Sequence, residues 1–457
     1  MPTSTSRSSH SPLSRRKDSI GIRTFVGTIA AIIATSIAIG YASTRLASDS
    51  LVEGRREAFA ATLEARAASL EGYLATLRGH VTTLATDPST TVAVEAFTAA
   101  FAPAGAGGAT SAEAARARIA AHHDEHLAKR FRDNGATWTG GDALIPNDAA
   151  GRTLQDAYIV ANPNPVGSKH LLEASTAGLA YDEVHAREHP RFRTALEAFG
   201  YYDIFLFDAQ GHAVYTVFKE SDFATSMREG PFAGSNLARL VRQVLDGGGD
   251  TQACDFASYT PSYGAQAGFI AAPVVRDGKV VGALAVQVPI DRIDAMCGLA
   301  AGLGESGEVV LGGPDGRLRS NSRLSETPTV GTASVLAEVA KRAADGASGS
   351  TTTDAAGTPT LAAFQPFDFL GQKWAILGTI DMDEVLAPVR TLQWWIAGVA
   401  ALSVTVVSLV ALPVARSISR RARSVVDGLG RVASGDLSAE LEVVGRDEFA
   451  AIAVRCN

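Results

Sequence analysis

Cysteine is scarce in this sequence: three residues in 457 are too few for a disulfide-rich scaffold or a four-thiolate zinc site. Basic charge is not in excess either. The 41 Lys and Arg stand against 48 Asp and Glu, and the net charge of −7 disfavours a nucleic-acid binder. With 46% hydrophobic and 19% charged residues the composition is that of ordinary globular proteins, which excludes wholesale disorder, a collagen and a coiled-coil rod. At ~150 residues per domain, the length suggests about three units.

Motifs of common enzymes are also missing. The sequence has no G-x-S-x-G elbow, no Walker loop, no kinase signature and no H-E-x-x-H. One G-x-G-x-x-G run covers residues 302–307, but a strand-like run follows it, whereas dinucleotide binding needs a helix there. We therefore predict a flexible junction at this run, no enzyme activity and no cofactor for this stretch of chain.

Two long uncharged runs are present, Thr24–Thr44 and Thr391–Ala415. About 20 apolar residues at 1.5 Å each cross the ~30 Å hydrocarbon layer as a helix. A buried core helix is the alternative for both. A cleaved signal peptide is a second alternative for the first run, although its apolar region normally has only 7–15 residues. We predict two membrane spans.

The charges flanking the two runs predict the orientation. Residues 1–23 hold five basic side chains and one acid, a net charge of +4. Residues 413–457 hold seven Arg and six acids, a net charge of +1. The segment between has −7 − 4 − 1 = −12. Both ends are expected in the cytoplasm, with an acidic segment of roughly 345 residues on the other side.

A long helix is predicted after the first span, because no proline occurs there before Pro88. A helix over Ser43–Thr86 would be about 65 Å long. It can pack on its own domain or form a dimer, and the two readings are compatible. Its apolar residues alternate spacings of four and three, which is typical of an a/d seam: Leu63, Ala67, Leu70, Leu74, Leu77, Val81 and Leu84.

Two sets of strand-like runs follow, and they predict an α+β fold in which helices cover one face of antiparallel sheets. Helices are expected over Ser111–Arg132, Tyr181–Phe199, Ser235–Leu245 and Ser334–Ala344. The expected strands are Ala157–Ala161, Asp203–Asp208, Ala213–Phe218, Gly268–Val275, Lys279–Val288, Glu308–Leu311, Arg317–Ser320, Leu361–Phe367 and Trp374–Ile380.

The order of span, helix, larger module, smaller module and span resembles the double Cache sensors of bacterial methyl-accepting chemotaxis proteins. The runs YYDIFLFD (201–208), YTVFKESDF (215–223), DFASY (255–259) and GESGE (304–308) carry this resemblance. It implies two PAS-like modules outside the cytoplasmic membrane. The implied organisation is a cytoplasmic tail (1–23), a first span (24–44), a stalk and helical region (45–135), a membrane-distal module (136–300), a membrane-proximal module (301–390), a second span (391–415) and an incomplete linker (416–457).

The segment after the second span resembles a HAMP linker. An amphipathic helix, a GDLS turn and a DEF run follow each other directly. Because the second helix has hardly begun at Asn457, we expect a C-terminally truncated chain, whose cytoplasmic kinase or adaptor partner would need the missing domain. The residues that would relay a signal are Ile418, Val425, Leu429, Gly435, Asp436, Leu437, Asp447 and Glu448.

A group of aromatic and charged residues predicts a solute pocket in the distal module. Tyrosine rings with one or two charges can hold a small polar solute, such as an amino acid, amine or carboxylate. The alternative is that the tyrosines are core residues and the charges lie at the rim. The candidate ligand-binding residues are Tyr202, Asp203, Tyr215, Lys219, Asp222, Asp255 and Tyr259.

Two histidine pairs at helical spacing, His122 with His126 and His185 with His189, could in principle bind zinc. The first pair lies among charged residues, and Pro190 is expected to end the helix of the second, so we predict no metal site. Cys254 and Cys297 could form a disulfide in an oxidising compartment, which their spacing does not decide.

These observations predict a dimeric, lipid-embedded inner-membrane receptor. A solute would bind the distal module, and helix shifts of ~1–2 Å would reach the HAMP helices. Two alternatives stay open. One is the input half of a histidine kinase or nucleotide cyclase, and the other is a docking or adhesion module that binds no solute.

Overall fold

The computed structural model describes residues 20–107, 109–436, 440, 443, 445 and 448–456. They divide into two compact units, which we describe separately. One unit is Gly54–Glu384 and contains every strand found among the described residues. The other contains residues 20–53 together with the described residues from 385 onward.

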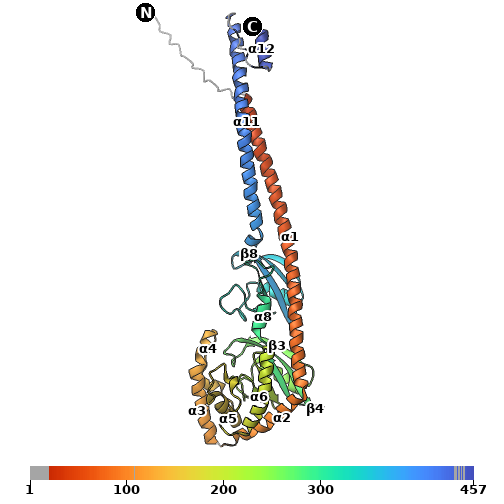
Figure 1. Ribbon diagram of the computed structural model, residues 1–457, viewed down its shortest axis with the longest axis vertical. Coiled ribbons are helices and arrows are strands. Elements are labelled where there is room, and N and C mark those ends of the chain that lie inside the picture. Colours follow the sequence, from red (N-terminus) through yellow and green to blue (C-terminus); the bar gives the residue numbers. More distant parts are fainter. Residues whose placement is uncertain are drawn as a thin grey trace, which may run out of the picture. The chain divides into compact units, whose positions relative to one another are not determined.

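Two helices are long and apolar enough to cross a membrane, as predicted. The first, α1, runs without interruption over Ile20–Thr86, and the second, α11, over Ala387–Ala433 (Figure 1). The most apolar window of each is wholly exposed, unlike the core helix of a soluble protein. Trp394 and Trp395 are 79% and 71% exposed near the start of α11, where tryptophans of membrane helices meet the lipid headgroups.

The apolar seam of α1 is covered by the chain itself. Leu63 and Phe59 lie against the backbone at Gly378 of the second sheet. The guanidinium of Arg66 donates to the carbonyls of Met296 (2.7 Å) and Cys297 (3.0 Å). Since six of the seven seam residues are buried in this way, the seam does not by itself support a dimer.

The larger module is built on an antiparallel sheet in the order β2-β1-β5-β4-β3. One face packs on α7 (Asn236–Gly247) and the other on α2 (Pro88–Phe101). Because both faces are covered, the expectation of one covered face is wrong; β1 and β2 are accordingly apolar and buried at successive positions. The strands are β1 (Ile204–Asp208), β2 (Ala213–Thr216), β3 (Gln252–Ser258), β4 (Gln266–Arg276) and β5 (Lys279–Gln287).

Further helices gather around this sheet (Figure 1). They are η1 (Ala102–Gly107), α3 (Ala109–His126), α4 (Ala128–Asp133), η2 (Gly141–Leu144), α5 (Ala149–Gln155), η3 (Asp156–Val160), η4 (Lys169–Leu171) and α6 (Ala180–Phe199). Two expectations are wrong here. The run 157–161 is not a strand, because η3 continues α5 as a π-helical turn; a short apolar run does not separate strand from buried helix. Pro190 does not end α6, whose buried side chains on both sides of the proline keep it packed.

The smaller module has a sheet in the order β6-β9-β8-β7. Helix α9 (Ala337–Ala344) covers one face through Val339, Ala340 and Ala343. The expected strand 317–320 makes only isolated bridges. The strands are β6 (Glu308–Gly312), β7 (Gly349–Ala355), β8 (Thr358–Phe369) and β9 (Gln372–Asp381); the short helices α8 (Ile290–Cys297) and α10 (Met382–Val385) flank the module, and α12 (Glu448–Cys456) follows α11.

Gly282 offers a test of the sheet geometry. It lies in the central strand β5, where a Cβ would collide with the backbone oxygen of Phe207 and with Val94 of α2. We expect Gly282→Ala to lower the free energy of unfolding by about 1–3 kcal/mol, since backbone and packed core must both move. Chemical denaturation measures the change. Gly79→Ala, on an open face of α1, is the matched control and should not destabilise; equal effects of the two substitutions would contradict the packing described.

Candidate ligand-binding site

The turn after β2 brings three predicted residues, Asp203, Lys219 and Asp222, into one buried cluster, which we call the charged cluster. Asp203 precedes β1, and its Oδ1 accepts the backbone N–H groups of Val217 (2.9 Å) and Phe218 (3.1 Å). Its Oδ2 is buried without a hydrogen-bond partner. Burial, and then the charge of Asp222, raise the pKa of Asp203.

Lys219 is almost fully buried and has a left-handed backbone with φ of 57°. Its Nζ donates to the carbonyl of Thr216 and lies 4.2 Å from the centroid of the Tyr215 ring. Burial lowers the pKa of Lys219, while the nearby Asp203 acts in the opposite direction. An ammonium over an aromatic face in a water-poor site is poised to interact with an anionic group.

Asp222 accepts a 2.6 Å hydrogen bond from the Tyr259 hydroxyl, but its Oδ1 is buried without a partner. Burial raises the pKa of Asp222 to about 6. Next to it, Glu220 accepts from the hydroxyl of Tyr202 (3.0 Å), and burial raises its pKa well above the usual range. Buried carboxylates with unused oxygens are the pattern expected where a partner is missing.

Backbone strain gathers at the same place. Among the described residues, six that are not glycine have positive φ, and three of them surround the charged cluster: Lys219 (57°), Ala224 (59°) and Tyr263 (58°). Such conformations cost of order 1–3 kcal/mol each and occur preferentially at functional sites.

The predicted Tyr215 joins the cluster to a histidine network. A 2.7 Å hydrogen bond connects its hydroxyl with Nδ1 of His189, whose Nε2 meets the carbonyl of His170 at 2.7 Å. His185 stacks on His189 with ring centroids 4.4 Å apart. Burial lowers the pKa of His189 to about 3. Within the described ranges no group of three or more His, Cys, Asp or Glu could hold a metal ion.

Two adjoining cavities lie beside the cluster. The inner one is enclosed, about 20 Å³, with room for roughly one water, and Lys219, Glu220 and Ser221 form part of its wall. The outer one is about 430 Å³. Both cavities have His122 and Lys169 in their walls, so the outer cavity adjoins the inner one at these residues.

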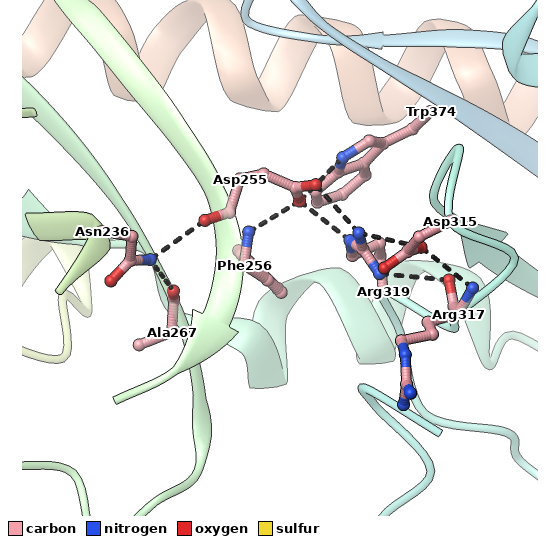
Figure 2. A network of polar contacts seen from close by, with 8 residues as sticks. All are labelled: Asn236, Asp255, Phe256, Ala267, Asp315, Arg317, Arg319 and Trp374. Carbon is pink, nitrogen blue, oxygen red and sulfur yellow. Dashed lines mark hydrogen bonds and ion pairs between the residues drawn. The ribbon is translucent and has the colours of Figure 1, made fainter. Parts of the chain in front are cut away.

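Asp255 lies apart from the cluster. Its carboxylate forms a bidentate pair with Arg319 of the smaller module (2.8 and 2.9 Å) and accepts from Nε1 of Trp374 at 3.0 Å. Figure 2 shows this contact between the two modules, with Asn236 holding the Asp255 backbone carbonyl from the other side. Of the predicted ligand residues, Asp255 is therefore the one that the structure places elsewhere. Nearby Cys254 is a free thiol, and so is the buried Cys297.

The glycine run at 302–307 forms turns before β6, consistent with a junction. It holds a carboxylate of the chain itself: Glu384 accepts the backbone N–H groups of Glu305 (3.0 Å) and Ser306 (2.8 Å) and the Ser306 hydroxyl (2.5 Å). These hydrogen bonds, that of the Ser306 side chain first, lower the pKa of Glu384.

The predicted relay residues lie at the end of α11 and beyond it. Helix α11 ends at Ala433, and Gly435 follows with φ of 97°, as the glycine turn predicts. Asp436 accepts from Arg431 at 2.7 Å. Leu437 and Asp447 lie outside the described residues. The others are placed as follows: Ile418 and Leu429 are 45% and 43% exposed, Val425 is half-buried, and Glu448 starts α12.

The β1–β2 hairpin that positions the cluster has a titratable clasp. The Asp208 carboxylate meets Nδ1 of His212 at 2.9 Å, and this hydrogen bond raises the pKa of His212 above 6.5. A raised pKa means that the stabilisation is fully present below pH 6.5 and is lost as the pH rises through the folded-state pKa.

We expect His212→Gln to lower the free energy of unfolding at pH 5.5 and to change it little at pH 8.5. Because His212 is partly exposed, the difference should stay below about 1 kcal/mol. Denaturation of the unsubstituted chain and of the His212 variant at the two pH values measures this difference. If the two stabilities change with pH in parallel, the hydrogen bond between Asp208 and His212 has no such role.

Several residues of the site were not predicted. Glu220 and Ser221 lie in the run YTVFKESDF but were not predicted as ligand residues, and His122 was predicted only to lie among charged residues. Lys169 and the Asn-Pro-Asn-Pro run at 162–165 were not predicted to belong to a site. The two closely spaced prolines, which rigidify a loop, were the available signal for the outer cavity.

The chain is similar to known proteins in three comparisons. Residues 414–455 match the HAMP domain family. Over 198 residues, 42% of this chain, the sequence is 26% identical to a probable chemoreceptor (y4sI) of Sinorhizobium fredii, and it spans about a quarter of that relative's length.

Two solved ligand-binding domains of chemoreceptors are also similar. That of Pseudomonas fluorescens CtaA with L-leucine is 16% identical, with a TM-score of 0.30 over 42% of this chain and 75% of that one. That of Campylobacter jejuni Tlp3 with 4-methylisoleucine is 10% identical, with a TM-score of 0.36 over 74% and 93%.

Proposed function

We propose that this chain is the sensory part of a two-span chemoreceptor of the bacterial cytoplasmic membrane. Its larger module binds a small extracellular solute at the charged cluster, and the change reaches the HAMP segment through α11. The observation that supports this most is the charged cluster itself: buried carboxylate oxygens without partners, and a strained lysine that forms part of the wall of an enclosed cavity. The chain acts as a receptor, not an enzyme, in this proposal.

The charge asymmetry around the spans supports the orientation. The basic residues before the first uncharged run and after the second favour cytoplasmic ends, so both sheet modules would lie outside. Protease added to intact spheroplasts should then digest both sheet modules, while carbonate washing should leave the chain in the membrane. Protection of the modules, or release of the chain by carbonate, would reject the topology.

Solute binding is tested with the full chain in detergent. A ligand that binds only the folded state, at 100 times its dissociation constant, adds about 2.7 kcal/mol to the free energy of unfolding. Thermal denaturation with panels of amino acids, amines and carboxylates should therefore find at least one stabilising solute. Asp222→Asn should abolish that shift, whereas Asp246→Asn, an exposed aspartate on α7, should keep it. No stabilisation by any solute would count against direct sensing.

A further inference from the structure

We infer that the outer cavity beside His122 and Lys169 is an anion subsite, so that the sensed solute carries a carboxylate or phosphate group. This rests on the proposed function, because it names the ligand class of the same site. The volume of about 430 Å³ lies within the range of small-molecule pockets.

The ionisable residues in the walls of the cavity are all basic. Four of its residues are basic and none is acidic: His122, His126, Arg130 and Lys169. Lys169 is only 5% exposed. The Nδ1 of His122 is buried without a hydrogen-bond partner. Burial first, then repulsion by Lys169 and His126, lower the pKa of His122 to about 4. An anion in the cavity would relieve this repulsion and accept the unused donors.

The cavity is preformed. The side-chain amide of Asn162 donates to the carbonyls of Tyr158 and Lys169, both at 2.9 Å, and Lys169 Nζ donates back to the Asn162 carbonyl at 2.9 Å. Pro163 and Pro165 restrict the loop between them. Because Lys169 and Arg130 donate to the backbone carbonyls of Asn162 and Val166, little order has to be created when an anion binds.

The subsite is tested on the full chain in low-salt detergent buffer with succinate, inorganic phosphate and putrescine as probes. Stabilisation by succinate, by phosphate or by both supports the inference and tells a carboxylate from a phosphate ligand. Arg130→Gln should weaken that binding at least tenfold, while Arg132→Gln, an exposed neighbour on α4, should leave it unchanged.

The outcomes separate the two proposals. If amines or other cations stabilise the chain and anions do not, the subsite is refuted while solute sensing stands. If no probe and no member of the wider solute panel stabilises it, both fall. Equal loss of binding in the Arg130 and Arg132 variants would also refute the subsite, because only Arg130 lines the cavity.

The geometry points to a second inference, carried by different contacts: strand β3 couples the charged cluster to the smaller module. At its C-terminal end, Tyr259 holds the Asp222 carboxylate at 2.6 Å. Four residues earlier, Asp255 binds Arg319 and Trp374, as Figure 2 shows. The register of β3 against β4 shifts between Cys254 and Ala257, so Asp255 lies in the irregular part of the strand.

The smaller-module end of this path is tightly packed. Trp374 is fully buried in β9 and stacks on Phe369 with ring centroids 4.0 Å apart. Phe256, in the irregular part of β3, meets Trp374 edge-on at 5.3 Å. Strand β9 leads through α10 directly to α11 in the sequence. A displacement of β3 therefore cannot be absorbed at a loose contact before it reaches β9.

Hydrogen exchange of the full chain tests the coupling without a ligand. Tyr259→Phe removes the hydrogen bond to Asp222 and should speed exchange in β3 and in β9 (Gln372–Asp381), but not in α3. Tyr201→Phe, another buried tyrosine, is the control and should leave β9 unchanged. A change confined to residues 203–225, or a uniform rise in every segment, would overturn the coupling.

Discussion

Replacing Lys219 with methionine is expected to make the chain more stable and unable to respond to its solute. The ammonium of Lys219 is buried, and its hydrogen-bond acceptor is a backbone carbonyl. Burying a charge carries a desolvation cost that an apolar side chain of similar volume does not have. The solute-induced rise in melting temperature should vanish in the same variant, because the cation over Tyr215 is gone.

The pH dependence of this gain has a defined sign. Burial lowers the pKa of Lys219 below its ordinary value of 10.5, so the folded state binds the proton less readily than the unfolded chain. The free-energy cost of burying the Lys219 charge is full below the folded-state pKa and disappears as the pH approaches 10.5. The advantage of Lys219→Met should therefore shrink as the pH rises. Denaturation across this range measures it; Lys373→Met, an exposed lysine on β9, is the control. A destabilised Lys219 variant that still binds the solute would contradict the role given to this side chain.

Replacing Arg319 with methionine should instead loosen the pairing of the two modules. Its side chain is 6% exposed and holds both oxygens of Asp255. Breaking a fully buried pair costs about 3–5 kcal/mol. Since Asp255 keeps 30% exposure, we expect about 2 kcal/mol here, with thermal unfolding broadened into two transitions.

Two further variants serve as controls for the Arg319→Met prediction. Arg317→Met, an exposed arginine two residues away, should cost little. The double variant Arg319→Met with Asp255→Asn should cost less than the sum of the single changes, because both remove the same interaction. Strict additivity would show that the bidentate pair does not hold the modules together.

Local patterns predicted most of the architecture. The uncharged runs gave the two span candidates, and alternating spacings gave the buried face of α1. Strands with apolar residues at successive positions, such as β1 and β5, were found for the same reason. The edge strands β3 and β7 were missed, because their residues are polar or half-buried and carry no such pattern.

The site was predicted in composition but not in arrangement. Asp255 and Tyr259 lie four residues apart in the run DFASY, and both were predicted for one pocket. The register shift in β3 separates them, and nothing local in the sequence marks it. The outer cavity was missed because it depends on distant segments, since α3, α4 and the loop before η4 meet only after folding.

The uninterrupted helix α11 has a mechanical corollary. It runs for 47 residues through Pro413, which is about 70 Å. The direction in which the side chains of its last turns face is therefore fixed relative to that of its first turns. Each residue inserted near its end would rotate everything downstream by about 100°, whereas seven inserted residues restore the original facing to within about 20°. A series of variants with one to seven alanines inserted should therefore lose the output of the HAMP segment and then regain it at seven. The period of this loss and recovery is set by the screw symmetry of the helix alone.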